Sequence, residues 1–259
     1  MPGDERADGA RPPANASWLE LSTPAGPMRV YRVAPRLGAE PPVALIVLQE
    51  AFGVNEHIQD VTRRAAAEGY LALAPDLFHR GAATVDYADQ ATAMQRIAEL
   101  GHDEIGADVA AVLAHLAVVE NVPAGRTSVI GFCFGGRAAF TAATRSPGLA
   151  STVAFYGPGV AAGPHAVLDF VASITGPVLM IVGDQDPTIP AEHIAAIQEA
   201  CAQAGTDLRI RIFPGAGHAF HCDARPALYR SDAARQAWRE AAAFLAETTR
   251  SSAPHSDAT

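Results

Sequence analysis

Apolar runs typical of strands alternate with helical segments along most of this chain. Strands are predicted at residues 43–48, 70–74, 152–156, 178–182 and 208–213, with one more that starts at Ser128. Helices are predicted at residues 56–68, 86–100, 103–119, 138–144, 190–204 and 226–248. The run at 43–48 is apolar throughout, so its strand is expected to be covered on both faces. This alternation predicts an α/β fold with a doubly wound, mostly parallel sheet that binds ligands at the carboxyl ends of its strands.

The two ends of the chain depart from this pattern. Residues 18–22 and 28–33 flank a Pro-Ala-Gly-Pro turn, which predicts an antiparallel hairpin ahead of the parallel sheet. Residues 1–16 and 250–259 are short, polar and without periodicity, so both are expected to be disordered. One domain is therefore predicted at residues 17–249, without a repeat or an interior linker.

Composition narrows the classes of function. The chain has 259 residues, of which 49% are hydrophobic and 18% charged, as in a globular protein with a well-buried core. A formal net charge of −9 argues against nucleic acid or an anionic membrane as a partner. The N-terminus lacks the apolar segment of a secretory signal, and no apolar run is long enough to span a bilayer. We expect a cytoplasmic monomer.

The cysteines favour a free thiol over a disulfide framework. Cys133, Cys201 and Cys222 are odd in number and lack Cys-x-x-Cys spacing, and a reducing compartment suits a working thiol. Cys222 also lies near His218 and His221, but three ligands at this spacing rarely converge outside a helix. A metal site is therefore not expected.

Residues 131–136 carry the most informative motif. Gly131-Phe132-Cys133-Phe134-Gly135 is the nucleophile-elbow pattern Gly-x-Cys-x-Gly, with cysteine in place of the usual serine. Its glycines remove Cβ atoms that would collide in a sharp turn from strand to helix. The turn brings the sulfur near the first N–H groups of the next helix, which favour a thiolate. A buried structural cysteine in a glycine-rich turn explains this motif equally well on its own.

Two later loops supply partners for the thiol. Asp184 and Asp186 follow one predicted strand, and His218 follows the last one. The order nucleophile, acid, histidine is that of α/β-hydrolases, and all three loops fall on the same edge of the sheet. His218 is expected to shuttle the proton while the acid fixes its tautomer. Gly215 and Gly217 suit a tight loop that aims the histidine.

Asp186 is the preferred acid. It lies further along its loop, just before Pro187, where the chain can turn toward the histidine. Asp184 lies next to the strand end and is expected to hold the loop backbone through an Asx turn. Capping of the loop is the alternative role for either carboxylate.

The loop after the first long strand contributes backbone groups and a carboxylate. In α/β-hydrolases this loop supplies one N–H group of the oxyanion hole, so Ala51 and Phe134 are the expected donors. Glu50 is unexpected there, because a carboxylate raises the pKa of a neighbouring thiol unless it accepts the thiol proton. It is either a switch on the nucleophile or a salt-bridge partner of an arginine.

Together these motifs resemble the dienelactone hydrolase (carboxymethylenebutenolidase) family. Six segments match in family order, at residues 49–55, 75–78, 131–136, 155–157, 183–186 and 215–220. The resemblance implies an α/β-hydrolase fold that opens an enol-lactone ring through a thioester acyl-enzyme, with no metal or organic cofactor. It also implies a triad of Cys133, Asp186 and His218. Glu50 would hold the resting thiol protonated until substrate binding frees it to take the proton.

The substrate side departs from the family pattern. Family members that act on dienelactone use two arginines to hold its carboxylate, and Cys222 occupies the position of one. The other lies in the helical segment after Pro-Asp-Leu, where Gln90 and Arg96 are the nearest residues. Arg80 and Arg225 are candidates to replace the pair, although neither matches in register.

Aromatic side chains in the strand-end loops are expected to line an apolar pocket, with core packing as the alternative for each. They are Phe52, Phe78, Phe134, Tyr156 and Phe220. Arg137 is expected to support the elbow rather than to contact substrate. The predicted function is hydrolysis of an enol-lactone or a related carboxylic ester through a Cys133 thioester. A broad-specificity carboxylesterase or other lactonase is the alternative, and a non-catalytic thiol sensor is a further one.

Overall fold

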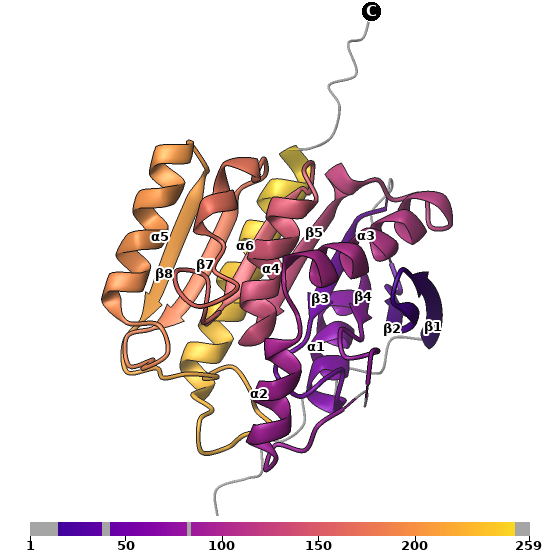
Figure 1. Ribbon diagram of the computed structural model, residues 1–259. Helices are drawn as coiled ribbons and strands as arrows, with labels where there is room; N and C mark the ends of the chain where they lie inside the picture. Colours follow the sequence, from indigo (N-terminus) through magenta and orange to yellow (C-terminus); the bar gives the residue numbers. More distant parts are fainter. Residues whose placement is uncertain (1–14, 38–41, 82–83, 252–259) are drawn as a thin grey trace, which may run out of the picture.

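The strands form one mixed sheet in the computed structural model, which describes residues 15–37, 42–81 and 84–251 (Figure 1). They are β1 Asn15–Thr23, β2 Gly26–Ala34, β3 Ala44–Leu48, β4 Leu71–Pro75, β5 Thr127–Phe132, β6 Ser151–Phe155, β7 Val178–Gly183 and β8 Leu208–Phe213. Their order is β1-β2-β4-β3-β5-β6-β7-β8. Strands β3 to β8 are parallel to one another, whereas β2 pairs antiparallel with both β4 and β1. The predicted mostly parallel sheet with an N-terminal hairpin is therefore confirmed.

Helices follow most of the parallel strands. They are α1 Glu56–Ala67, α2 Gln90–Ala98, α3 His102–Val118, α4 Phe134–Arg145, α5 Ala191–Ala204 and α6 Ser231–Ser251, with short 3-10 helices at η1 Ala124–Arg126 and η2 Leu168–Ser173. Helix α3 packs against α4, and both α1 and α6 pack against the sheet.

The core has two parts because side chains alternate between the faces of each strand. On β3, Leu45 and Val47 join the cluster that contains residues of α1 and α6. Ile46 and Leu48 join the cluster that contains residues of α3 and α4. Every residue of β3 is buried, as the prediction of a strand covered on both faces requires.

Several predicted boundaries differ from the structure, and helix α4, for example, begins at Phe134 rather than at residue 138. Helix α2 begins at Gln90 rather than at residue 86, because the Asp89 side chain accepts a hydrogen bond from Thr92 N and caps the helix there. Helix α6 begins at Ser231 rather than at residue 226, since turns occupy the preceding segment. Strand β1 begins at Asn15, within the N-terminal extension expected at 1–16. The other residues expected to be disordered, apart from 250 and 251 in α6, lie outside the described part of the chain.

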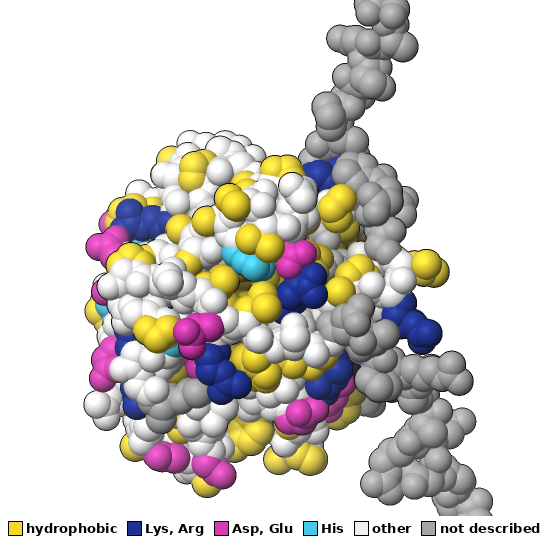
Figure 2. All heavy atoms as spheres, turned by 90° about the vertical axis from the view of Figure 1, so that its right-hand side faces the viewer, with side chains coloured by type: hydrophobic (Ala, Val, Ile, Leu, Met, Phe, Trp, Pro, Cys, Tyr) yellow, Lys and Arg dark blue, Asp and Glu magenta, His cyan; other side chains and the backbone are white. Residues whose placement is uncertain are grey.

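The surface beside β1 mixes charges of both signs. Figure 2 shows this face, and among its described residues most basic side chains lie beside acidic ones rather than forming one broad patch. None of the described helices is long and apolar enough to cross a membrane. The expected absence of nucleic-acid and membrane partners stays a prediction.

The close approach of backbones around α4 predicts that Gly136 tolerates no side chain. A Cβ atom there would lie 2.7 Å from Gly157 Cα and 2.7 Å from Phe155 O, and both are backbone atoms. Gly136→Ala should therefore lower the free energy of unfolding by about 1–3 kcal/mol or more. Gly125→Ala is the matched control, because the nearest atom to its Cβ is 3.8 Å away. Urea unfolding measures both, and equal effects of the two substitutions would contradict the argument.

Candidate active site

Cys133 occupies a strained turn between β5 and α4. Its φ is 54° and its ψ is −121°, a region that residues with a side chain rarely adopt. The turn is held by hydrogen bonds from Cys133 N to Phe155 O at 3.0 Å and from Gly136 N to Cys133 O at 2.8 Å. A Cβ atom on Gly131 or Gly135 would overlap neighbouring backbone atoms. These are the steric reasons for glycine that the sequence predicts.

Three side chains from separate loops form a hydrogen-bonded chain. His218 Nε2 lies 3.1 Å from Cys133 Sγ, and His218 Nδ1 lies 2.8 Å from Asp186 Oδ2. Cys133 is half-buried, whereas the Asp186 carboxylate is fully buried. Asp186 follows β7 and His218 follows β8, so parallel strands bring the three residues to one edge of the sheet. The structure thus brings together the three residues predicted as a catalytic triad.

Thr188 is a fourth polar member of this group that sequence reasoning missed. Its hydroxyl donates a hydrogen bond to Asp186 Oδ1 at 2.6 Å, and its backbone N–H donates to the same oxygen at 2.9 Å. The hydroxyl oxygen also lies 3.1 Å from His218 Nδ1. Thr188 therefore fixes the carboxylate rotamer that faces the histidine. The signal for it is a hydroxyl residue two positions after the acid, where a side chain can fold back on an Asp.

Asp184 has a different partner. Its Oδ1 accepts a hydrogen bond from Gly215 N at 2.7 Å, so this carboxylate ties the loop after β7 to the loop after β8. The expected role in holding loop backbone is thus confirmed, although the bond crosses between loops and is not a local Asx turn. Gly215 has a φ of +72°, which supports the expected tight histidine loop.

The electrostatics of the triad favour an imidazolium at His218. Burial opposes the charged ring, but hydrogen bonds to Asp186 and Cys133 outweigh it and raise the pKa of His218 to about 10. Burial also acts against the Asp186 carboxylate, yet its hydrogen bonds to His218 and Thr188 hold its pKa below the ordinary value. The site therefore stabilises a negative acid beside a positive histidine.

A cavity of about 550 Å³ opens beside Cys133 and His218. Its described lining consists of Ala51, Phe52, Gln90, Met94, Ile97, Ala98, Cys133, Phe134, Arg137, Pro158, Gly159, Ala162, Pro164, His165, Thr188, His218 and Arg225. Ala51 and Phe134, the expected oxyanion donors, both lie in this wall next to the thiol. The size and the mostly apolar wall suit a small organic molecule.

Only one of the four other expected pocket aromatics reaches this lining. Phe52 lines the cavity, whereas Phe78, Tyr156 and Phe220 are buried elsewhere. The ring of Phe78 lies 6.2 Å from that of Phe134, and the ring of Phe220 lies 5.4 Å from that of Tyr156. Core packing, the alternative considered for each, describes the positions of Phe78 and Phe220. Tyr156 also lies against the His218 ring, at 5.4 Å.

Arg80 is engaged away from the cavity. Its guanidinium donates two hydrogen bonds to Asp108, at 2.7 and 2.9 Å, and Asp108 is fully buried on α3. A buried carboxylate with this bidentate pairing holds the arginine in place. The expected role of Arg80 in binding substrate is thus not supported by its position. Of the residues near the family's other arginine position, Gln90 lines the cavity and Arg96 does not.

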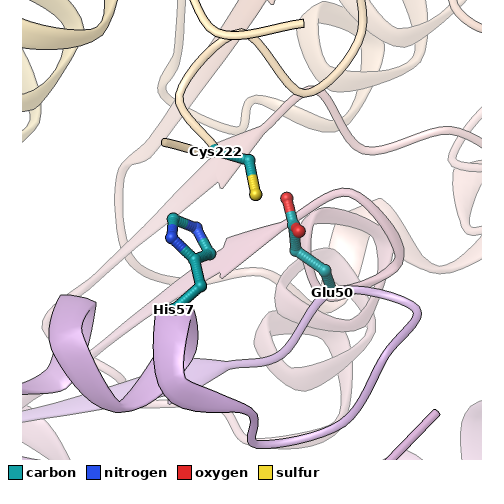
Figure 3. Close-up of side chains that lie close together, drawn as sticks. All are labelled: Glu50, His57 and Cys222. Carbon is teal, nitrogen blue, oxygen red and sulfur yellow. The ribbon is translucent and has the colours of Figure 1, made fainter. Parts of the chain in front are cut away.

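Glu50 is buried beside Tyr156, Cys222 and His57. It is 1% exposed, and Tyr156 Oη donates a 3.4 Å hydrogen bond to its Oε1. Figure 3 shows its carboxylate facing the side chains of Cys222 and His57. One donor atom from each of these three residues lies within 4.8 Å of the others. Burial and the nearby Glu50 charge raise the pKa of the Cys222 thiol, which keeps it protonated at neutral pH.

Oxygen, nitrogen and sulfur donors of this kind can bind zinc. His57 Nδ1 lies 2.9 Å from Asp223 Oδ1, an arrangement that also orients histidine ligands in metal sites. A metal ion bound here would be coordinated by the Glu50 carboxylate, to which the family resemblance assigns control of the Cys133 thiol. The expectation that the protein works without a metal stays a prediction.

Comparison with known proteins identifies relatives over nearly the whole domain. The model of the "Dienelactone hydrolase family" matches residues 28–249. A Yersinia pestis protein named "Putative carboxymethylenebutenolidase" is 37% identical over 216 residues, which cover 81% of this chain and 79% of that protein. A Bradyrhizobium protein named "Probable 2-oxo-3-(5-oxofuran-2-ylidene)propanoate lactonase" is 32% identical over 233 residues, with 88% and 92% covered.

Solved structures agree with this assignment. The crystal structure titled "Putative Dienelactone Hydrolase from Klebsiella pneumoniae" superposes with a TM-score of 0.81 at 30% sequence identity. The match covers 90% of this chain and 98% of that one.

Substitution of the two acids in the loop after β7 is expected to lower activity to very different extents. Asp186→Asn should lower kcat by about 10³- to 10⁴-fold, because an amide favours the wrong histidine tautomer. Asp184→Asn should cost less than about 10-fold, since an amide oxygen still accepts the Gly215 N–H. Steady-state kinetics of both variants, with any ester that the wild-type enzyme hydrolyses, measures the two losses in kcat. A larger loss in Asp184→Asn would show that Asp184, and not Asp186, is the acid partner of His218.

The raised pKa of His218 predicts a pH-dependent contribution to stability. Because the folded pKa is about 10 and the ordinary value 6.5, this contribution is complete below about pH 6.5 and is lost as the pH rises through about 10. The difference in free energy of unfolding between wild type and His218→Gln should shrink over that range. Urea unfolding at several pH values measures it, with His193→Gln on α5 as the control. A difference that grows with pH would show that the sign is wrong.

Proposed function

The chain belongs to the dienelactone hydrolase family and is a hydrolase of carboxylic ester or lactone bonds, and we propose its finer reaction from its site. In this proposal it opens an enol-lactone ring, or cleaves a related carboxylic ester, through a thioester on Cys133. The observation that carries the proposal is the chain of contacts from Cys133 Sγ through His218 to the buried Asp186. A non-catalytic thiol sensor would not need the second of these contacts.

The proposed acylation step uses the geometry directly. With the Cys133 proton on Glu50, the Cys133 thiolate lies beside the His218 imidazolium, and its sulfur attacks the substrate carbonyl. The N–H groups of Ala51 and Phe134 hold the oxyanion. As the tetrahedral intermediate collapses, the C–O bond of the ring breaks, and His218 gives its proton to the leaving oxygen. Asp186 holds the ring in one tautomer throughout.

Deacylation then repeats the same roles with water. His218 removes a proton from water, the hydroxide attacks the thioester carbonyl, and the Cys133 sulfur leaves and is reprotonated. A thiolate is a good leaving group, so the first intermediate returns to substrate unless the other leaving group is also stable. An enolate meets this condition better than an alkoxide does. Ordinary alkyl esters are therefore expected to be poor substrates.

Glu50 is proposed to control the state of the thiol. In the resting enzyme it would hold the thiol protonated, and on substrate binding it would take the proton. The structure has Cys133 beside His218 and Glu50 beside Tyr156, which corresponds to the arrangement after such a handover. The hydrogen bond from Tyr156 and full burial support a carboxylate that is restrained and poorly hydrated.

The substrate class rests on the cavity and on a relative. The cavity of about 550 Å³ is mostly apolar, as a small unsaturated ring requires. The Bradyrhizobium relative is named for a lactone whose ring carries an ylidene group and a propanoate. Cys222 stands where family members that act on dienelactone have an arginine, and this favours as the second candidate a broad-specificity carboxylesterase or a lactonase for another ring.

Hydrolysis of cis- and trans-dienelactone beside p-nitrophenyl acetate tests the proposal. Wild type should turn over at least one lactone, and Cys133→Ala should abolish turnover of both substrate types because no nucleophile remains. Cys133→Ser should fall far below wild type, since a serine hydroxyl is less readily activated than a thiol. Trapping the acyl-enzyme and measuring its mass would show the thioester on Cys133.

The results separate the candidates. Turnover of the activated ester alone, lost in Cys133→Ala, would keep the mechanism and replace the lactone with an ester substrate. Hydrolysis that survives in Cys133→Ala would refute the thioester mechanism. Circular dichroism of both variants confirms that the fold is retained.

A further inference from the structure

Arg137 is a buried cation in the lining of the cavity. It is the fourth residue of α4 and comes four positions after Cys133. Both line the cavity. Arg137 is 4% exposed, a rare degree of burial for an arginine.

Most of the hydrogen-bonding capacity of this guanidinium is unused. Its Nη2 donates to Leu100 O at 3.1 Å, and the guanidinium carbon lies 5.2 Å from the centre of the Phe134 ring. The buried Nη1 has no hydrogen-bond partner. No described carboxylate forms an ion pair with Arg137, and none lines the cavity. Glu50, for which the sequence offers a salt bridge with an arginine as one of two roles, faces Tyr156 and Cys222 instead.

An unpaired buried cation is costly, and an incoming anion removes that cost. Burial lowers the pKa of Arg137 to about 10, yet the group stays protonated at neutral pH. Charge-assisted hydrogen bonds between a guanidinium and a carboxylate are strong in a dry, apolar surrounding. In the free enzyme the positive charge of Arg137 is therefore unpaired, and an anionic group of a bound ligand would pair with it.

We propose that Arg137 forms the anion subsite of the cavity and binds a carboxylate carried by the substrate. This inference rests on the proposed function and names the substrate class within it: enol-lactones or activated esters with a carboxylate outside the reacting bond. Nη1 would donate to the carboxylate while Nη2 keeps Leu100 O. Because α4 carries Arg137 and begins beside Cys133, the helix fixes the distance between the anion and the attacked carbonyl.

Arg225 has a different place in the same cavity. Its guanidinium carbon lies 5.5 Å from the Phe52 ring and 5.7 Å from the Tyr87 ring, and the side chain is only partly buried. Water screens a partly exposed charge more than a buried one. Arg225 is thus suited to attract anions toward the cavity, whereas Arg137 is suited to bind them. The two arginines make unequal contributions to anion selectivity.

A pair of substrates that differ only in charge tests the subsite. Wild type should hydrolyse dienelactone with a higher kcat/KM than its carboxamide, and Arg137→Gln should reduce this ratio by about 10- to 100-fold, as expected for a lost charged hydrogen bond. Arg225→Gln should reduce it less. Arg235→Gln is the matched control: it removes one positive charge from an exposed position on α6 and should leave the ratio unchanged.

Binding to Cys133→Ala gives a readout that does not need turnover. Calorimetric titration with dienelactone and with its carboxamide should show the same preference, and Arg137→Gln in that background should remove it. If Arg137→Gln does not fold, Arg137→Lys replaces it and should show a preference between those of wild type and the neutral variant, because lysine keeps the charge but cannot form the same two bonds.

Failure of this inference is distinguishable from failure of the proposed function. An unchanged ratio in Arg137→Gln, a larger loss in Arg225→Gln, or no preference in wild type would each overturn the subsite while the Cys133 mechanism stands. Hydrolysis that persists in Cys133→Ala would overturn the mechanism instead. A preference that disappears in Arg137→Gln and persists in Arg235→Gln supports the subsite.

Discussion

Close contact between backbones at the start of α4 is the constraint on which the site depends. The backbone at Gly135 approaches Leu48 and Gln49, and the backbone at Gly136 approaches Phe155 and Gly157. Through these contacts α4 is seated between the ends of β3 and β6. The same contacts set the position of Cys133 relative to the loop after β3. The strained backbone of Cys133 persists because the surrounding contacts determine it.

The features of the site that could be predicted from the sequence are those set by backbone conformation and by the order of the strands in the sheet. Gly131 and Gly135 indicated the turn, and the order of loops after parallel strands indicated that Cys133, Asp186 and His218 would meet. The side-chain partners were less predictable, because they depend on rotamers and on contacts between distant segments. Arg80 pairs with Asp108 on α3, although no local pattern specifies this contact. Boundaries were missed for local reasons, such as the Asp89 cap of α2.

Two kinds of charge serve different ends in this molecule. Most arginines on the described surface pair with carboxylates, as Arg32 does with Glu120 and Arg209 does with Glu247. Such pairs add little to stability and chiefly keep the surface soluble and mixed in sign. Arg137 is the contrast: burial without a counterion makes it a poor contributor to folding. We therefore explain the burial of Arg137 by the anionic ligand that it is proposed to bind, and not by a contribution to the stability of the ligand-free enzyme.

The buried guanidinium of Arg137 also bears on how a turnover ends. Opening a lactone that already carries a carboxylate produces a second carboxylate at the reacting carbon. Among the described lining residues Arg137 is the one buried guanidinium, His218 and the partly buried Arg225 are the other basic groups, and most of the remaining wall is apolar. The new charge gains more from water than from the cavity, so hydrolysis itself weakens the hold on the ligand. In the proposed reaction the second negative charge of the product thus favours its release, and no conformational change is needed.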